Sequence, residues 1–330
     1  MRIVFFGTPE IAVPTLERLL AGPHEVVGVV SQPDRRRGRG KRLSPSPVSQ
    51  VALRKELPLL RPERVGDADC VEALAALEPD LGVVVAFGQF LPKKVRELPS
   101  RRYLINAHAS LLPKFRGASP IAQAILEGES KTGVSVMRIE REMDSGPVAL
   151  VSTTPIGVAE NTAELTLRLS EIAANAIAEA VDIIARDEVE WTAQDASRAT
   201  VAPKIEKADS ILDLRESARA LACRIHALAP RPGATLQLVD GEKLKILRAD
   251  RLAFDRGETA KPGTIALEDA AAALNIPLRI ATGEGWLVPL TLQRAGGKSL
   301  PVADFLRGYS LDANARFVAN GSESRESETR

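Results

Sequence analysis

The run DLGVVVAF at residues 80–87 is the most strand-like segment of the sequence. A short run of β-branched apolar residues of this kind predicts a strand. Outward from it, short apolar runs alternate with longer amphipathic stretches. Further strands are predicted at Arg2–Phe6, Glu25–Val30, Leu104–Ala107 and Gly133–Ile139, and helices at Pro9–Leu20, Ser46–Leu57, Asp69–Leu77, Ser119–Glu127 and Thr162–Arg186. The alternation predicts an α/β domain with a Rossmann-like, mostly parallel sheet wrapped by helices.

The character of the sequence changes after Trp191. Residues 192–208 lack hydrophobic periodicity and are interpreted as a linker lying over the surface. Beyond them the sequence predicts a helix at Arg215–Leu228 and strands at Ala234–Val239, Lys243–Ala249, Gly263–Ala266, Leu278–Ala281 and Trp286–Gln293. Glycine and proline punctuate these strands, as in a small OB-like β-barrel. We therefore expect one domain over residues 1–191, a second over 209–318, and a disordered polar tail over 319–330.

Length and charge limit the classes of protein to consider. A chain of 330 residues exceeds what one compact core usually holds, which agrees with two domains. The net charge is +1, so any attraction to nucleic acid has to come from a local patch. Cys70 and Cys223 are the two cysteines and lie far apart in sequence, which favours a reducing cytosol over a disulfide framework.

The apolar run within the opening residues MRIVFFGTPE is too short for the apolar core of a signal peptide. No later apolar run reaches the roughly eighteen residues of a membrane span. A cytoplasmic protein with no membrane partner is the expectation.

Two common cofactor motifs are incomplete. Gly7-Thr8-Pro9 follows the first predicted strand, where a dinucleotide-binding fold carries G-x-G-x-x-G, and only one glycine is present. This disfavours a nicotinamide-dependent dehydrogenase. Cys223 and His226 resemble half of a zinc site, but no second pair of ligands accompanies them, so no metal is expected.

The strongest candidate for chemistry is NAHASLLP at residues 106–113. Strand side chains alternate, so Asn106 and His108 share one face at the carboxyl edge of the sheet, where ligands of such folds bind. An amide donor and a proton-carrying ring suit the oxyanion of a tetrahedral intermediate. Asp144, in the turn Met143–Gly146, could hydrogen-bond the imidazole and fix its tautomer. The alternatives are a capping Asn106, a structural His108 and an ordinary Asp-Ser-Gly turn.

A strongly basic stretch, RRRGRGKR at residues 35–42, carries six cationic side chains in eight residues. Gly38 and Gly40 disfavour a helix, so a mobile loop is expected. This concentration of charge in a neutral chain favours an anionic polymer as partner, because phosphate contacts dominate nucleic-acid affinity. A solvated surface loop is the alternative. The stretch follows the second predicted strand and so leaves the sheet at the same edge as His108.

These motifs together resemble those of the methionyl-tRNA formyltransferases over nearly the whole chain. The matching stretches are Phe6–Glu10, Gln32–Lys41, Ser44–Val48, Val83–Gly88, Leu91–Pro92, Asn106–Pro113, Arg116–Ile121, Thr132–Val134 and Met143–Gly146. The Asn, His and Asp trio with Ser-Leu-Leu-Pro is shared by folate-dependent formyltransferases in general. The basic stretch and the C-terminal domain, which the family builds as an oligonucleotide-binding barrel, select the tRNA branch. Val201 and Arg231 depart from the family, which commonly has Tyr and often Trp there.

The resemblance implies an enzyme that transfers the formyl group of 10-formyltetrahydrofolate to methionyl-initiator tRNA, without a metal. It implies catalysis by Asn106, His108 and Asp144. Folate contacts are expected at Val84, Val85, Ala86, Phe87, Gly88, Ser110, Leu111, Leu112 and Pro113, and tRNA contacts at Arg35, Arg36, Arg37, Arg39, Lys41, Arg42 and Lys204. A monomer is expected. The alternatives are formyl transfer to a ribosylglycinamide or an amino-sugar nucleotide, folate hydrolysis, and RNA binding without catalysis.

Overall fold

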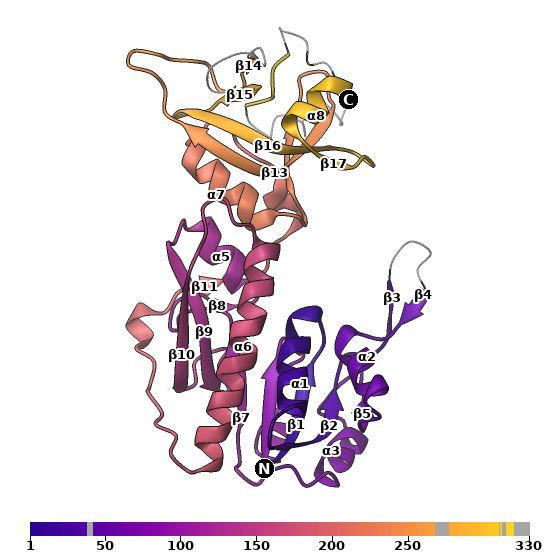
Figure 1. Cartoon of the computed structure of the whole chain (residues 1–330). Helices are drawn as coiled ribbons and strands as arrows, with labels where there is room; N and C mark the ends of the chain where they lie inside the picture. Colours follow the sequence, from indigo (N-terminus) through magenta and orange to yellow (C-terminus); the bar gives the residue numbers. More distant parts are fainter. Residues whose placement is uncertain (38–41, 268–276, 310, 312–314, 320–330) are drawn as a thin grey trace. The chain divides into compact units, whose positions relative to one another are not determined.

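The structure is a computed structural model that describes residues 1–37, 42–267, 277–309, 311 and 315–319 (Figure 1). The chain forms two compact units. Unit 1 comprises Met1–Pro120, Lys131–Pro155 and Thr166–Ala202, and unit 2 comprises Ile121–Ser130, Ile156–Leu165 and Pro203–Arg330. The tail that the sequence predicts to be disordered lies, except for Ala319, outside the described residues.

A seven-stranded sheet forms the centre of unit 1. In spatial order its strands are β10 (Val148–Pro155), β9 (Lys131–Arg138), β7 (Leu104–His108), β6 (Leu81–Val85), β1 (Arg2–Gly7), β2 (Glu25–Val30) and β5 (Leu59–Leu60). The pairs from β7 to β5 are parallel, whereas β9 runs antiparallel to both β7 and β10. The prediction of a mostly parallel sheet is confirmed. Strand β10 was not predicted, because it is a half-exposed edge strand ending in Ser-Thr-Thr-Pro.

Helices surround this sheet. They are η1 (Glu10–Ala12, a 3-10 helix), α1 (Val13–Leu20), α2 (Pro47–Arg54), α3 (Ala68–Ala75), α4 (Lys93–Arg96) and, from Thr166 onward, α6 (Thr162–Ala185). Helix α5 (Pro120–Leu126) belongs to unit 2 after its first residue. Helix α2 begins one residue later than predicted because Ser46 is its N-cap and accepts a 2.9 Å hydrogen bond from Ser49 N.

Close packing of neighbouring strands holds the middle of the sheet. Val4 and Phe6 of β1 pack in one buried cluster with Leu74 of α3 and Leu104 of β7. At Gly82 in β6, a Cβ atom would lie 2.1 Å from Leu104 Cδ2, so a larger residue there would displace the buried Leu104 side chain of β7. Burial of each large apolar side chain contributes about 2 kcal/mol. The paired strands therefore present their carboxyl ends as a rigid edge.

The basic stretch is partly regular. Arg35–Arg37 forms β3 and Arg42–Ser44 forms β4, and these strands pair antiparallel with Arg36 opposite Leu43. The hairpin projects away from the sheet (Figure 1). The prediction of an irregular loop is wrong for these two arms, because ladder hydrogen bonds join backbone groups whatever charge the side chains carry. Residues 38–41, including Arg39 and Lys41, lie outside the described residues.

Residues 192–202 are hydrogen-bonded into unit 1. Thr192 exchanges backbone hydrogen bonds of 2.8 and 2.9 Å with Val148. A 3-10 helix η2 (Ala196–Arg198) follows, and β11 (Val201–Ala202) pairs in parallel with β8 (Arg116–Gly117). The stretch expected to be a linker thus divides between the units, since residues 203–208 belong to unit 2.

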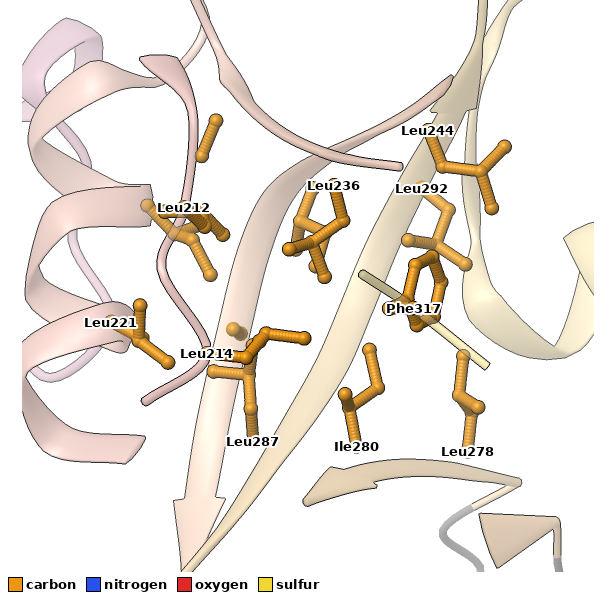
Figure 2. Packing of buried hydrophobic residues seen from close by; sticks show 14 of the residues in the cluster. Leu212, Leu214, Leu221, Leu236, Leu244, Leu278, Ile280, Leu287, Leu292 and Phe317 are labelled. Carbon is orange, nitrogen blue, oxygen red and sulfur yellow. The ribbon is translucent and has the colours of Figure 1, made fainter. Parts of the chain in front are cut away.

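Unit 2 is built around an antiparallel sheet. Its strands are β12 (Ala234–Gln237), β13 (Lys243–Leu252), β16 (Trp286–Arg294), β15 (Leu278–Ala281) and β14 (Ile265–Leu267), with β17 (Ser299–Pro301) paired to β16. Its helices are η3 (Lys207–Ser210), α7 (Ala218–Leu228) and α8 (Val302–Gly308). Leu221 of α7 packs with Leu236, Leu287 and Phe317 in the core (Figure 2). Within the described part of the chain, no helix combines the length and apolar character needed to cross a membrane.

Among the residues that the structure describes, the ladder of the unit-2 sheet does not close into a continuous barrel. Its ladder runs from β12 to β14, and these two edges are joined by isolated bridges from Phe317 to Leu238 and from Arg316 to Thr264. The observed fold is therefore an antiparallel sheet domain, a coarser description than the predicted OB-like barrel.

His226 gives unit 2 a pH-dependent element of stability. The side chain is buried on α7, and Nε2 accepts a 3.3 Å hydrogen bond from Ala249 N, so this nitrogen is unprotonated. Burial lowers the pKa of His226 below its ordinary 6.5, with nearby Arg248 acting in the same direction and Asp250 and Glu164 opposing it. The folded state therefore favours the neutral ring.

We predict that unit 2 loses stability as the pH falls below about 6.5 toward the lower folded pKa of His226, and that this contribution is constant above that range. The measurement is urea unfolding between pH 5 and 8, followed by tryptophan fluorescence of Trp286. His226→Gln keeps an acceptor that does not titrate, so its stability should change less over the same range. Identical pH dependence in both proteins would contradict the prediction.

Candidate active site

The carboxyl end of β7 places Asn106 and His108 as the sequence predicts. Asn106 pairs with Val84 of β6, and His108 pairs with Ser135 of β9. As alternate residues of one strand they lie on the same face. His108 is only 6% exposed, whereas Asn106 is partly exposed. The pair therefore spans from the interior to the surface at this edge.

The His108 ring is fixed by a backbone carbonyl. Nε2 lies 2.8 Å from the carbonyl oxygen of Phe115, and because a carbonyl can only accept, Nε2 carries a proton and donates it. Nδ1 lies 3.6 Å from Oδ2 of Asp144. Nδ1 is therefore the ring atom at which a proton can bind or leave, and it faces a carboxylate.

Asp144 is brought to His108 by a constrained turn. Its φ of 52° lies in the left-handed region, which costs a non-glycine residue about 1 kcal/mol. Oδ2 accepts a 2.8 Å hydrogen bond from Gly117 N, which directs the carboxylate toward the ring. At Gly146, a Cβ atom would lie 1.9 Å from Arg138 O, so the end of this turn requires glycine.

Asn106 supplies a free donor. Among the described residues, none forms a hydrogen bond with its side-chain amide, which is partly open to solvent. A primary amide in this position can donate to a ligand oxygen without breaking a bond in the protein. Asn106, His108 and Asp144 therefore combine a neutral donor, a proton-carrying ring and a carboxylate.

The loop after His108 is held by two buried serines. Ser110 Oγ donates to Lys114 O at 2.6 Å, so this hydroxyl shapes the loop. Ser135 Oγ donates to Ser110 O at 2.7 Å and accepts from Leu112 N at 3.1 Å. Leu111, Leu112 and Pro113 remain partly exposed. Ser135 was missed in the sequence, although its place on the strand opposite His108 was a signal.

The loop after β6 offers mainly its backbone. The side chains of Val84, Val85 and Phe87 are buried, while Ala86 and Gly88 are exposed with φ of 48° and 83°.

Two residues missed in the sequence hold this loop. Phe87 O accepts from Thr8 Oγ1 at 2.9 Å and from Gln32 Nε2 at 3.2 Å. Thr8 lies one residue and Gln32 two residues after the ends of the first two strands, which is the signal that could have found them.

The predicted cationic residues that the structure describes in unit 1 follow a different strand from Asn106 and His108. β2, which leads into the hairpin, is three positions from β7 in the sheet, or about 14 Å at about 4.8 Å per strand. Arg35 and Arg36 are exposed on β3. Arg37 and Arg42 belong to the hairpin strands, and their side chains are outside the described parts. Lys204 is exposed in unit 2, with Nζ 3.7 Å from Oε1 of Glu206.

Segment 115–117 supports both partners of the His108–Asp144 pair. Phe115 N donates to Thr200 Oγ1 at 2.9 Å, and Arg116 N donates to Thr200 O at 2.8 Å. Gly117 has a φ of 122°, and a Cβ atom there would lie 2.6 Å from Ala202 O. Residues 200–202 thereby fix the Phe115 carbonyl, which accepts the hydrogen bond from His108, and the Gly117 N–H, which donates to Asp144.

Comparisons with known proteins show the family. A family model described as formyl transferase matches residues 1–181, and one described as formyl transferase, C-terminal domain, matches residues 204–310. A methionyl-tRNA formyltransferase of Citrifermentans bemidjiense is 41% identical over 311 residues, covering 94% of each chain. One of Roseiflexus castenholzii is 43% identical over 317 residues, covering 96% of this chain and 98% of the relative.

A solved structure shares the fold. It is WlaRD, a sugar 3N-formyl transferase determined in the presence of dTDP and 5-N-formyl-THF, with a TM-score of 0.65 and 16% identity. The alignment covers 90% of this chain and 99% of WlaRD.

Proposed function

The chain belongs to the methionyl-tRNA formyltransferase family, and we propose that Asn106, His108 and Asp144 are its catalytic residues. The enzyme transfers the formyl group of 10-formyltetrahydrofolate to the amino group of methionyl-initiator tRNA, which forms N-formylmethionyl-tRNA for translation initiation. The observation that carries the catalytic assignment is the His108–Asp144 pair at the carboxyl edge of the sheet, with Nδ1 and Oδ2 3.6 Å apart.

The three residues divide the work of acyl transfer. The folate co-substrate supplies the formyl carbonyl and, as tetrahydrofolate, the leaving group. The side-chain amide of Asn106 donates to the oxygen that becomes negative when the amine attacks the formyl carbon. His108, anchored through Nε2 to Phe115 O, holds or moves a proton at Nδ1. Asp144 stabilises the positive charge of the protonated ring.

Backbone groups are proposed to bind the folate. The candidates are Val84–Gly88, where the exposed positions carry small residues, and Ser110–Pro113, whose loop is held by buried hydroxyls. Exposed peptide N–H and C=O groups suit a flat heterocycle that offers donors and acceptors along one edge. Ser110 contributes through its effect on the loop, since its hydroxyl is engaged with Lys114 O.

The cationic residues are proposed to bind tRNA. Arg35, Arg36 and the rest of the basic hairpin concentrate positive charge in a chain whose net charge is +1. Unit 2, with Lys204 at its start, is the proposed second tRNA contact, as an oligonucleotide-binding domain of the family's type. At the family's aromatic position the exposed Val201 offers less surface for stacking on a base. We expect a cytoplasmic monomer, where charged initiator tRNA is available.

The first prediction concerns the acceptor. Purified enzyme with 10-formyltetrahydrofolate should formylate methionyl-initiator tRNA much faster than glycinamide ribonucleotide or an amino-sugar nucleotide, because only tRNA can use the basic hairpin. The measurement is formyl incorporation with each acceptor in competition, with uncharged tRNA as the control for amine dependence. Preferential formylation of a small amine would overturn the proposed acceptor.

The second prediction concerns the catalytic trio. Asn106→Ala should lower kcat by about 10²–10³, the loss expected for one oxyanion donor, and His108→Ala or Asp144→Ala by about 10² or more. Steady-state formylation measures the losses, with thermal unfolding to confirm the fold. Asp187→Asn is a matched control, because Asp187 has a similar φ of 57° but pairs with Arg101. Near-normal turnover of His108→Ala would disprove the assigned roles.

The third prediction concerns the hairpin. Neutralising Arg39 and Lys41 to Ala should weaken tRNA binding and flatten its salt dependence by about one unit of slope for each phosphate that the variant no longer neutralises. Folate affinity should not change. The control is Arg54→Ala/Lys55→Ala, which changes two exposed basic residues at the end of α2. They precede the amino end of β5 and so lie at the amino edge of the sheet, whereas the hairpin follows the carboxyl end of β2. If the tRNA affinities of wild type and the hairpin variant had the same salt dependence, the hairpin would be a solvated surface feature that does not bind tRNA.

A further inference from the structure

Gln194 makes four hydrogen bonds, two to the turn that carries Asp144 and two to Arg116. Its Nε2 donates to the carbonyl oxygens of Asp144 and Gly146, each at 2.7 Å. Its Oε1 accepts from Nε and Nη2 of Arg116 at 3.0 and 2.7 Å. A primary amide has two N–H donors and two oxygen lone pairs, so this side chain is fully engaged.

The partners of Gln194 determine which end of the amide faces which way. Backbone carbonyls only accept, and the Arg116 guanidinium only donates, so the amide nitrogen must face the Asp144 turn. A carboxylate of the same size could keep the bonds to Arg116 but could not donate to the two carbonyls. The position therefore requires an amide, and filling the same space is not enough.

The two carbonyls belong to the turn that aims Asp144 at His108. Asp144 adopts a left-handed φ of 52°, which a non-glycine residue keeps only when its surroundings hold it. The hydrogen bonds of Gln194 act on both sides of Ser145 and so prevent the turn from relaxing. Arg116 and Gly117 are consecutive, and Gly117 N holds the Asp144 carboxylate at 2.8 Å. Gln194 thus joins the backbone of the turn to the strand that holds its side chain.

We propose that Gln194 is a positioning residue for formyl transfer, which keeps the Asp144 carboxylate directed at Nδ1 of His108. This rests on the proposed roles of Asp144 and His108. The hydrogen bonds of Gln194 go to Arg116, Asp144 and Gly146, so it acts through the conformation of Asp144. A displacement of about 1 Å in such a pair is enough to lower turnover by about 10²-fold.

The central test compares Gln194→Glu with Gln194→Ala. Both should lower kcat by about 10- to 100-fold, with Gln194→Glu no better than Gln194→Ala although it keeps the shape of the side chain. The KM for the formyl donor and for tRNA should stay within about twofold of wild type, because all four hydrogen bonds of the Gln194 side chain go to protein groups. Asp195→Asn is the matched control, since Asp195 caps η2 through Ser197 and should leave kcat unchanged.

A second background separates positioning from general destabilisation. In Asp144→Asn, measured in single turnovers, Gln194→Glu should reduce the rate by less than about threefold, because the carboxylate that it positions is gone. Arg116→Ala removes the group that orients the Gln194 amide but leaves the amide itself in place. It should lower the rate of formyl transfer less than Gln194→Glu does, and it tests the same role if Gln194→Glu does not fold.

Two outcomes would overturn the role of Gln194: wild-type kcat in Gln194→Glu, or an equal loss in the wild-type and Asp144→Asn backgrounds. Wild-type formylation of methionyl-initiator tRNA is measured first. Its absence would overturn the proposed function, whereas an active wild type with an equally active Gln194→Glu would overturn only the inference about Gln194.

Discussion

The hydrogen bond from Gly117 N to Asp144 Oδ2, at 2.8 Å, is the interaction on which the rest of the site depends. It directs the carboxylate toward His108, whose own orientation is set by Phe115 O at 2.8 Å. Both supports are backbone groups only two residues apart. The geometry of the His108–Asp144 pair therefore depends on the conformation of segment 115–117. This segment includes Gly117, which has a φ of 122°.

That segment is in turn held from a distant part of the chain. Phe115 N donates to Thr200 Oγ1 across 85 residues, and β11 pairs with β8 beside it. Closing so long a loop costs conformational entropy, which is offset by the several hydrogen bonds that form when residues 192–202 dock in unit 1. Residues 192–202, the last stretch of unit 1, therefore contribute to the site through these hydrogen bonds.

The parallel sheet also separates chemistry from electrostatic attraction. The proposed catalytic groups are few: an amide and an imidazole at the carboxyl end of β7, and one carboxylate in the turn between β9 and β10. The cationic side chains follow β2, three strand positions away, and belong to a hairpin that projects into solvent. Parallel strands bring both features to one edge while keeping the Arg charges away from His108, where they would disfavour a protonated ring.

Much of this arrangement was determined by the sequence alone. Strands β1, β2, β6, β7 and β9 and the shared face of Asn106 and His108 follow from local periodicity, because side chains alternate at every residue of a strand. Asp144 was chosen from its Asp-Ser-Gly turn and from the family resemblance. Only the tertiary structure decided what holds these groups: Phe115 O, Gly117 N, Gln194, the antiparallel edge strand β10 and the paired arms of the basic hairpin. Most of these involve backbone atoms, which every residue carries, or pairings between residues far apart in sequence. Such contacts leave no residue-type pattern along the chain, so they are specified only when the whole fold brings the segments together.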